Sequence, residues 1–137
     1  MNFSFSWTDL RNYGVALGIF LVIDFIWLTV IAKSLYAQHL GYLMAPKANL
    51  LAALIFYLLF VMGLQFFVLN PALASGDWTR ALFAGIFFGL VTYATYDLTN
   101  LATVKDWPIL ITVIDLAWGS VVSGVTALLS FLIIRRF

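Results

Sequence analysis

Long apolar runs alternate with short polar segments along this chain. Four runs are long enough to cross the hydrocarbon core of a bilayer, which takes about 20 helical residues. They extend approximately over residues 13–32, 48–69, 81–102 and 109–134. The pattern predicts an all-α fold, an integral membrane four-helix bundle in which residues 1–137 form a single transmembrane domain.

The breaks between the runs are polar or contain helix-ending residues. The longest extends from Lys33 to Lys47 and includes His39, Gly41 and Pro46. We expect a loop there, with a short interfacial helix or a re-entrant segment as the alternative. The other breaks are short and lie around Pro71 and Pro108.

Composition supports the membrane assignment and excludes several classes of function. The chain is 64% hydrophobic and 9% charged, whereas soluble domains have about 25% charged residues. A net charge of +1 gives no electrostatic case for nucleic acid. The absence of cysteine excludes disulfides and thiolate chemistry.

The distribution of basic residues predicts an orientation. An even number of spans places both termini on one side, together with Arg11, Arg80, Arg135 and Arg136, and leaves Lys33, Lys47 and Lys105 on the other. Basic residues are enriched on the cytoplasmic side. We therefore expect a multi-pass protein of the inner (cytoplasmic) membrane with cytoplasmic termini.

Three aspartates, Asp24, Asp97 and Asp115, lie inside the apolar runs. A carboxylate within hydrocarbon costs roughly 2.5–3.5 kcal/mol on insertion scales, so such residues mark functional sites by default. Counting residues from the predicted helix ends places all three in the same half of the membrane. No Lys or Arg lies within the predicted spans. The carboxyl groups therefore either retain protons or bind a cationic ligand.

Helical phase separates the three aspartates. Asp97 flanks a polar face of the third span, close to Tyr96 and Asn100, and Asp115 lies on a face of small and hydroxyl residues in the fourth. Asp24 is isolated among leucines in the first. The pair formed by Asp97 and Asp115 is the stronger candidate for chemistry.

Two of the aspartates belong to a repeated pattern, I-D-x-x-W. Trp27 follows Asp24 by three residues, and Trp118 follows Asp115 in the same way. Each indole should lie on its aspartate's side of the helix, either to fill the bundle or to form an aromatic wall for a cation or an apolar ligand. Because the two spans run in opposite directions, the repeat hints at an inverted internal duplication. The predicted ligand-binding residues are Asp24, Trp27, Tyr96, Asp97, Asn100, Asp115 and Trp118.

His39 is the only histidine and lies in the predicted loop. Its ordinary role would be a solvated surface residue. If the loop folds back, His39 joins Asp97 and Asp115 as a candidate for acid–base catalysis. No helical spacing of histidines supports a metal site, so none is predicted, and the residues identify no cofactor.

Beyond the I-D-x-x-W patterns, the third span contains the segment Tyr96-Asp97-Leu98-Thr99-Asn100-Leu101-Ala102-Thr103. These segments resemble the bacterial membrane family catalogued as domain-of-unknown-function family 2177, and the resemblance covers essentially the whole chain. It implies a small polytopic bacterial membrane protein without an assigned activity or substrate.

Three functions remain open from the sequence. The first is binding, or transport by a homodimer, of a cation, a proton or a small amphipathic ligand, with Gly-x-x-x-Gly faces available for dimerisation. The second is an enzyme that acts on a lipid or other apolar substrate through paired carboxyl groups. The third is a structural partner of another membrane protein. All three place the chain in contact with the lipid bilayer.

Overall fold

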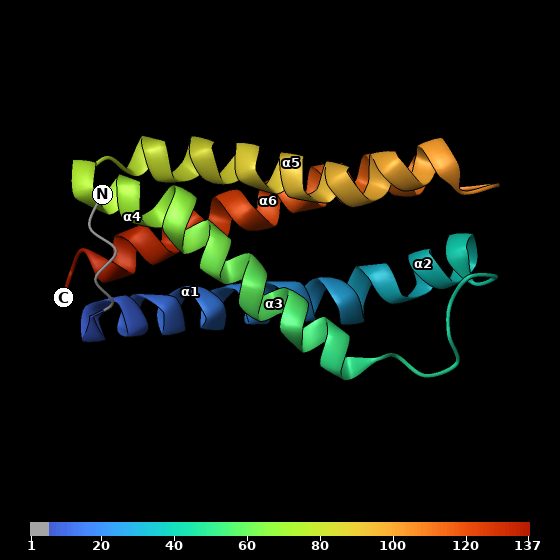
Figure 1. The fold of residues 1–137 in the computed structure, drawn as a ribbon, viewed down its shortest axis with the longest axis horizontal. Helices are drawn as coiled ribbons and strands as arrows, with labels where there is room; N and C mark the ends of the chain where they lie inside the picture. The colour runs from blue at the N-terminus through green and yellow to red at the C-terminus, as the bar shows by residue number, and fades with distance from the viewer. Residues whose placement is uncertain (1–5) are drawn as a thin grey trace.

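The computed structural model describes residues 6–137, and this part of the chain forms four helical rods, each long and apolar enough to cross a membrane (Figure 1). The all-α membrane fold is confirmed. The rods comprise, in order, α1 (Trp7–Ile26), η1 (Trp27–Ala32) and α2 (Lys33–Leu40); α3 (Leu50–Leu64), η2 (Gln65–Leu69) and α4 (Asn70–Ser75); α5 (Trp78–Thr103); and α6 (Ile109–Ile134).

The first rod is much longer than the apolar run that predicted it. It begins at Trp7 and ends at Leu40, so most of the polar segment expected as a loop is helical. The segment continues the first rod and is neither a separate interfacial helix nor a re-entrant one. Lys, Leu, Ala and Gln are good helix formers, and no helix-breaking residue occurs before Gly41. The connection between the rods is therefore limited to residues 41–49.

Two π-helical segments, η1 and η2, interrupt the α-helices within the first two rods. The second precedes Pro71, which lies in the first turn of α4. Proline has no N–H, and its ring collides with the carbonyl group four residues earlier in a regular α-helix. The wider π turn accommodates this residue, which explains why the rod continues to Ser75 instead of ending at the proline.

Polar side chains cap the N-termini of the first three rods, whereas α6 begins after Pro108 without a side-chain cap. Ser6 and Asp9 form a reciprocal capping box at the start of α1, and the Asn49 side chain accepts a hydrogen bond from the Ala52 amide at the start of α3. Asp77 caps α5, and hydrogen bonds from the Thr79 side chain and amide lower the pKa of its carboxyl group. These bonds fix where the spans begin.

The closest pair of helices is α5 and α6, which run antiparallel along their whole length (Figure 1). Glycines permit this approach. A Cβ atom on Gly89 would collide with the carbonyl oxygen of Gly119, and one on Gly85 would lie 2.9 Å from the carbonyl oxygen of Ser123. The Gly85-x-x-x-Gly89 pattern is therefore used within the protein, between two of its own helices.

The remaining two rods pack on this pair unequally. The α1 helix lies beside α6, whereas α3 crosses the bundle obliquely (Figure 1). The C-terminal part of the second rod, η2, contacts α5 and α6. The N-terminal part of α3 diverges from α1 and ends away from the other helices (Figure 1). This divergence opens the side of the bundle between α1 and α3.

Contacts at the end of the bundle opposite the start of α1 hold α2 in place (Figure 1). Leu40 packs with Trp107 and Ile111 in a small buried cluster, and the Tyr42 hydroxyl donates a 2.8 Å hydrogen bond to the carbonyl oxygen of Asp106. The end of the first rod is thereby tied to the connection between α5 and α6. This places residues of α2 beside the first turns of α6.

Candidate functional site

The two I-D-x-x-W patterns meet in the middle of the bundle. Trp27, at the start of η1, stacks on Trp118 of α6 with ring centroids 4.3 Å apart and an angle of 8° between the planes. Because α1 and α6 run in opposite directions (Figure 1), the stacked indoles lie between the aspartates of the two patterns. A repeated pattern of a few residues thus forms one contiguous structure.

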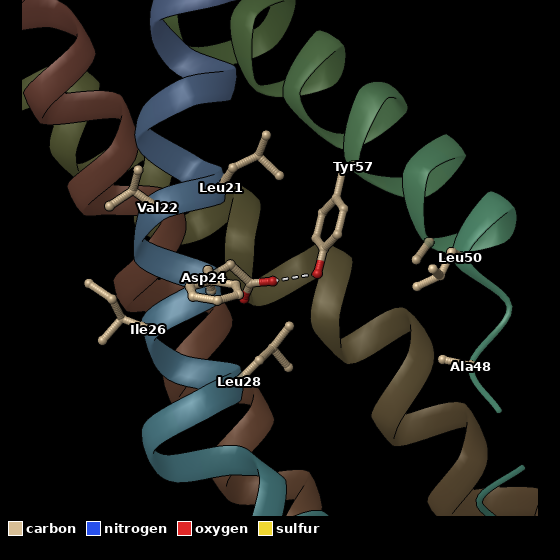
Figure 2. A pocket seen from close by; sticks show the side chains of 10 residues that line it. Leu21, Val22, Asp24, Ile26, Leu28, Ala48, Leu50 and Tyr57 are labelled. Carbon is tan, nitrogen blue, oxygen red and sulfur yellow. Dashed lines mark hydrogen bonds between the residues drawn. The ribbon is translucent and has the colours of Figure 1, made fainter. Parts of the chain in front are cut away.

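Asp24 is not isolated, contrary to the expectation from its leucine neighbours. The Tyr57 hydroxyl of α3 donates a 2.6 Å hydrogen bond to Asp24 Oδ2 across the gap between the helices (Figure 2). The Trp118 indole N–H donates a 3.3 Å bond to Asp24 Oδ1. Each carboxyl oxygen therefore accepts one hydrogen bond from another helix. The indole of the I-D-x-x-W pattern on α6 thus donates a hydrogen bond to the aspartate of the pattern on α1.

Asp115 is bound from the extension of the first rod. The Tyr36 hydroxyl of α2 donates a short hydrogen bond to Asp115 Oδ1, and the Trp27 indole lies beside the same hydroxyl. Tyr36 reaches this position because the helix continues beyond Ala32 instead of turning into a loop. Asp24 and Asp115 are thus matched, since each accepts a hydrogen bond from a tyrosine of another helix.

Asp97 differs from the other two aspartates. Its side chain is 0% exposed, and neither carboxyl oxygen has a hydrogen bond among the described residues. The carboxyl group of Asp115 lies within hydrogen-bonding reach, so one shared proton would join the two groups. A buried polar group without a partner is costly and calls for a specific explanation. Asp97 and Asp115 together form a carboxyl pair, with donors supplied to only one of its members.

Tyr93 of α5 lies at the centre of the cluster. It interacts electrostatically with all three aspartates and with Tyr57, and its ring packs against Gly119 of α6, where a Cβ atom would collide with the tyrosine. The three carboxyl groups predicted as one site therefore lie within electrostatic reach of one tyrosine. They come from α1, α5 and α6.

Three other predicted site residues stand apart from this cluster. The Tyr96 side chain is exposed on the outer face of α5 and contacts Trp107 edge-on, although it remains within electrostatic reach of Asp97 and Asp115. Asn100 is half-buried one turn further along. His39 lies on α2, with its Nδ1 3.0 Å from the Leu35 carbonyl oxygen of its own helix.

The described residues contain no group of three His, Cys, Asp or Glu side chains that would hold a metal ion. Ion pairs are also absent from the three aspartates in residues 6–137, where their partners are tyrosine, tryptophan and each other. The cluster is therefore acidic, surrounded by aromatic hydrogen-bond donors, and without a neutralising basic side chain.

Sequence reasoning missed the tyrosines that complete the site. Tyr57 lies within the second predicted span, which contains no aspartate, and Tyr36 lies in the segment expected as a loop. A signal was present, because Tyr57 and Tyr93 occur in the membrane half predicted for the aspartates and Tyr36 lies in the segment that borders this half. A phenol has one hydroxyl donor to offer a buried carboxyl group, which makes tyrosine the partner to look for when Lys and Arg are missing.

A cavity of about 660 Å³ opens between α1 and α3 beside Asp24 (Figure 2). It occurs where α3 diverges, and the Asp24–Tyr57 hydrogen bond crosses it. Its walls are otherwise apolar. The lining residues are Leu21, Val22, Asp24, Phe25, Ile26, Leu28, Ala48, Leu50, Ala53 and Tyr57.

A match to a known protein family covers most of the chain. Residues 10–132 match the family described as "Predicted membrane protein (DUF2177)". The chain belongs to this family. The match includes all three aspartates and both tryptophans of the site, which confirms the resemblance noted from the sequence. No curated protein and no solved structure matches the chain.

Proposed function

We propose that Asp97 and Asp115 form an intramembrane site that binds a proton or a small cation and exchanges one for the other. The observation that carries this proposal is Asp97, a fully buried carboxyl group without a hydrogen-bond donor that lies against a second carboxyl group. Two adjacent carboxylates in a low-dielectric medium repel each other strongly. The pair must therefore share a proton or take up a cation.

The surroundings of the pair support exchange rather than a fixed structural role. A structural polar group in the membrane is normally satisfied by its neighbours, and Asp115 is satisfied in this way by Tyr36. Asp97 has no donor except a proton shared with Asp115, so a proton or a cation can complete its bonding. The Tyr36 hydroxyl already bonds to Asp115, and Tyr93 lies within electrostatic reach of both carboxyl groups.

The orientation of the protein sets the side from which the site is reached. The excess of arginine near the termini supports an orientation with the N-terminus of α1 and the C-terminus of α6 in the cytoplasm. The pair lies toward the opposite end of the bundle, where α2 meets the start of α6. Cations would thus enter from the non-cytoplasmic side.

Proton release on cation binding tests this function. Purified protein in weakly buffered detergent would receive NaCl, KCl or MgCl₂, with choline chloride as the control for ionic strength, and a pH-sensitive dye would report released protons. At least one metal ion should release up to about one proton per chain, because cation binding requires a deprotonated ligand. The Asp97→Asn variant should release none.

A matched control separates the site from general effects of removing a carboxylate. Asp77→Asn removes an exposed carboxylate outside the spans and should leave the release unchanged. Release by Asp97→Asn equal to that of the native protein would exclude the pair as the site. The absence of release by all three metal salts would exclude cation–proton exchange.

A further inference from the structure

The cavity between α1 and α3 combines two properties that rarely occur together. Its walls are apolar and open to the side of the bundle, as expected for a groove that faces lipid chains. One acidic side chain, Asp24, nevertheless lines it (Figure 2). Its volume of about 660 Å³ is within the range of small-molecule sites, roughly 300–1,000 Å³.

The hydrogen bonds of Asp24 indicate which kind of ligand the groove favours. Tyr57 and Trp118 each donate to a different carboxyl oxygen, which suits a negatively charged group. Each oxygen of a carboxylate has about two acceptor positions, so accepting capacity remains. The side chain is only 6% exposed, and no basic residue of the described chain pairs with it.

We propose that this groove binds a lipophilic amine, a protonated ammonium group attached to an alkyl or aromatic body. The ammonium would pair with Asp24, while the body would lie against apolar residues such as Leu28 and Leu50. A cation is the complement that a buried, hydrogen-bonded carboxylate in a membrane lacks. A neutral lipid chain alone would fill the walls but leave this charge unpaired.

The groove is separate from the carboxyl pair of the proposed exchange site. Asp24 lines the groove, whereas Asp97 and Asp115 do not. The two proposals can therefore fail independently. An amine that binds through Asp24 should not require Asp97.

Binding of dodecylamine to the protein in phosphatidylcholine nanodiscs tests the inference, with dodecanol as the neutral probe of equal chain length. Native protein should bind dodecylamine saturably and dodecanol weakly. Asp24→Asn should weaken dodecylamine binding about tenfold or more, the usual effect of losing a bond to a charged group. Asp77→Asn, which removes an exposed carboxylate that does not line the groove, should bind dodecylamine like the native protein.

A steric pair of variants keeps the test valid if Asp24→Asn folds poorly. Ala53 lines the groove, whereas its neighbour Ala52 is exposed on α3 and does not line it. Ala53→Trp should therefore abolish binding of dodecylamine, and Ala52→Trp should not. Equal binding by both tryptophan variants, or equal affinity of native protein for dodecanol and dodecylamine, would overturn the proposal.

Discussion

Asp24 and Asp97 occupy different hydrogen-bonding environments, although both are buried within membrane-spanning helices. Asp24 receives a hydrogen bond on each oxygen, from Tyr57 and from Trp118. Asp97 receives none and faces Asp115. Donors stabilise the ionised form of a carboxyl group, whereas a neighbouring carboxylate opposes it. The first arrangement suits a counter-charge, and the second suits a mobile proton or cation.

At this scale the sequence predicted the acidic residues but not their partners. A buried carboxyl group is identifiable because it interrupts an apolar run, as Asp24 does. Its hydrogen-bond donors come from helices distant in the chain, 33 residues away for Tyr57 and 94 for Trp118. Helical phase gives the direction of a side chain on its own helix, but it contains no information about which helix lies opposite.

The Tyr57→Phe variant tests the bond that spans α1 and α3. It removes the donor to Asp24 Oδ2 while keeping the ring that packs against Phe20. We expect the free energy of unfolding to fall by about 0.5–2 kcal/mol, between values for hydrogen bonds within membranes and those to charged groups. Thermal unfolding in detergent would measure the change.

Tyr96→Phe provides the matched control for this variant. The Tyr96 hydroxyl forms no hydrogen bond within residues 6–137, so its removal should change the free energy of unfolding by no more than about 0.5 kcal/mol. Equal losses in the two variants would show that the Tyr57–Asp24 bond does not contribute to the stability of the bundle.

Among the helices, α6 is the best predicted because its whole polar face is buried. Thr112, Asp115, Gly119 and Ser123 share one side of the helix in the sequence, and all four are buried in the structure. The polar face of α5 behaves differently. Gly85 and Gly89 are buried, but Thr99, further along that face, is exposed. Its hydroxyl bonds to carbonyl groups of its own helix, which lets a threonine face lipid without a partner.

The ends of the first two rods were harder to predict than their centres. An apolar run reveals the part of a helix that crosses hydrocarbon, whereas the continuation from Lys33 to Leu40 is polar and lacks that signal. Pro71 predicted an end where the structure has a π turn and a further helix. The π turn that accommodates the proline is a local adjustment of the backbone, and the pattern of apolar and polar residues does not reveal it.

Gly89→Ala tests the contact between α5 and α6. The added methyl group would collide with the Gly119 carbonyl oxygen, which belongs to the backbone and cannot rotate away. We expect a loss of about 1–3 kcal/mol in the free energy of unfolding, typical of overpacking. Gly14→Ala is the control, because among residues 6–137 no atom outside the adjoining backbone of its own helix lies within 4 Å of the added methyl group. The control should be neutral or more stable by up to about 1 kcal/mol, and a loss equal to that of Gly89→Ala would contradict the packing argument.

At the scale of the whole molecule, the helices of the bundle pack unequally, and this determines how each acidic site can be reached. The pair α5–α6 is closely packed, whereas α3 leaves a lateral opening toward α1 (Figure 1). The carboxyl pair and the groove thus differ in their access, since the first is enclosed by helices and the second opens to the side. A ligand dissolved among the lipid chains would therefore reach Asp24 from the side of the bundle.

A homodimer through α1 is the remaining prediction at this scale. The Gly14-x-x-x-Gly18 pattern is exposed and nothing in the described chain fills the space beside either glycine, whereas Gly85 and Gly89 are used internally. Small residues at this spacing let a second helix approach closely. A Gly14→Leu, Gly18→Leu double variant should raise the dissociation constant of the dimer about tenfold or more, which corresponds to about 1.4 kcal/mol.

Energy transfer between labelled copies in vesicles, measured as lipid is added to dilute them, would determine this dissociation constant. Ala117→Leu enlarges an exposed small residue on α6 and should leave the constant unchanged. If native protein shows no energy transfer above random proximity, the chain is a monomer, and the carboxyl pair must then bind its proton or cation without a second copy. If the dimer forms but tolerates both leucines, another face mediates it. The interface is assigned to Gly14 and Gly18 only if the dissociation constant rises in the α1 variant and stays unchanged in Ala117→Leu.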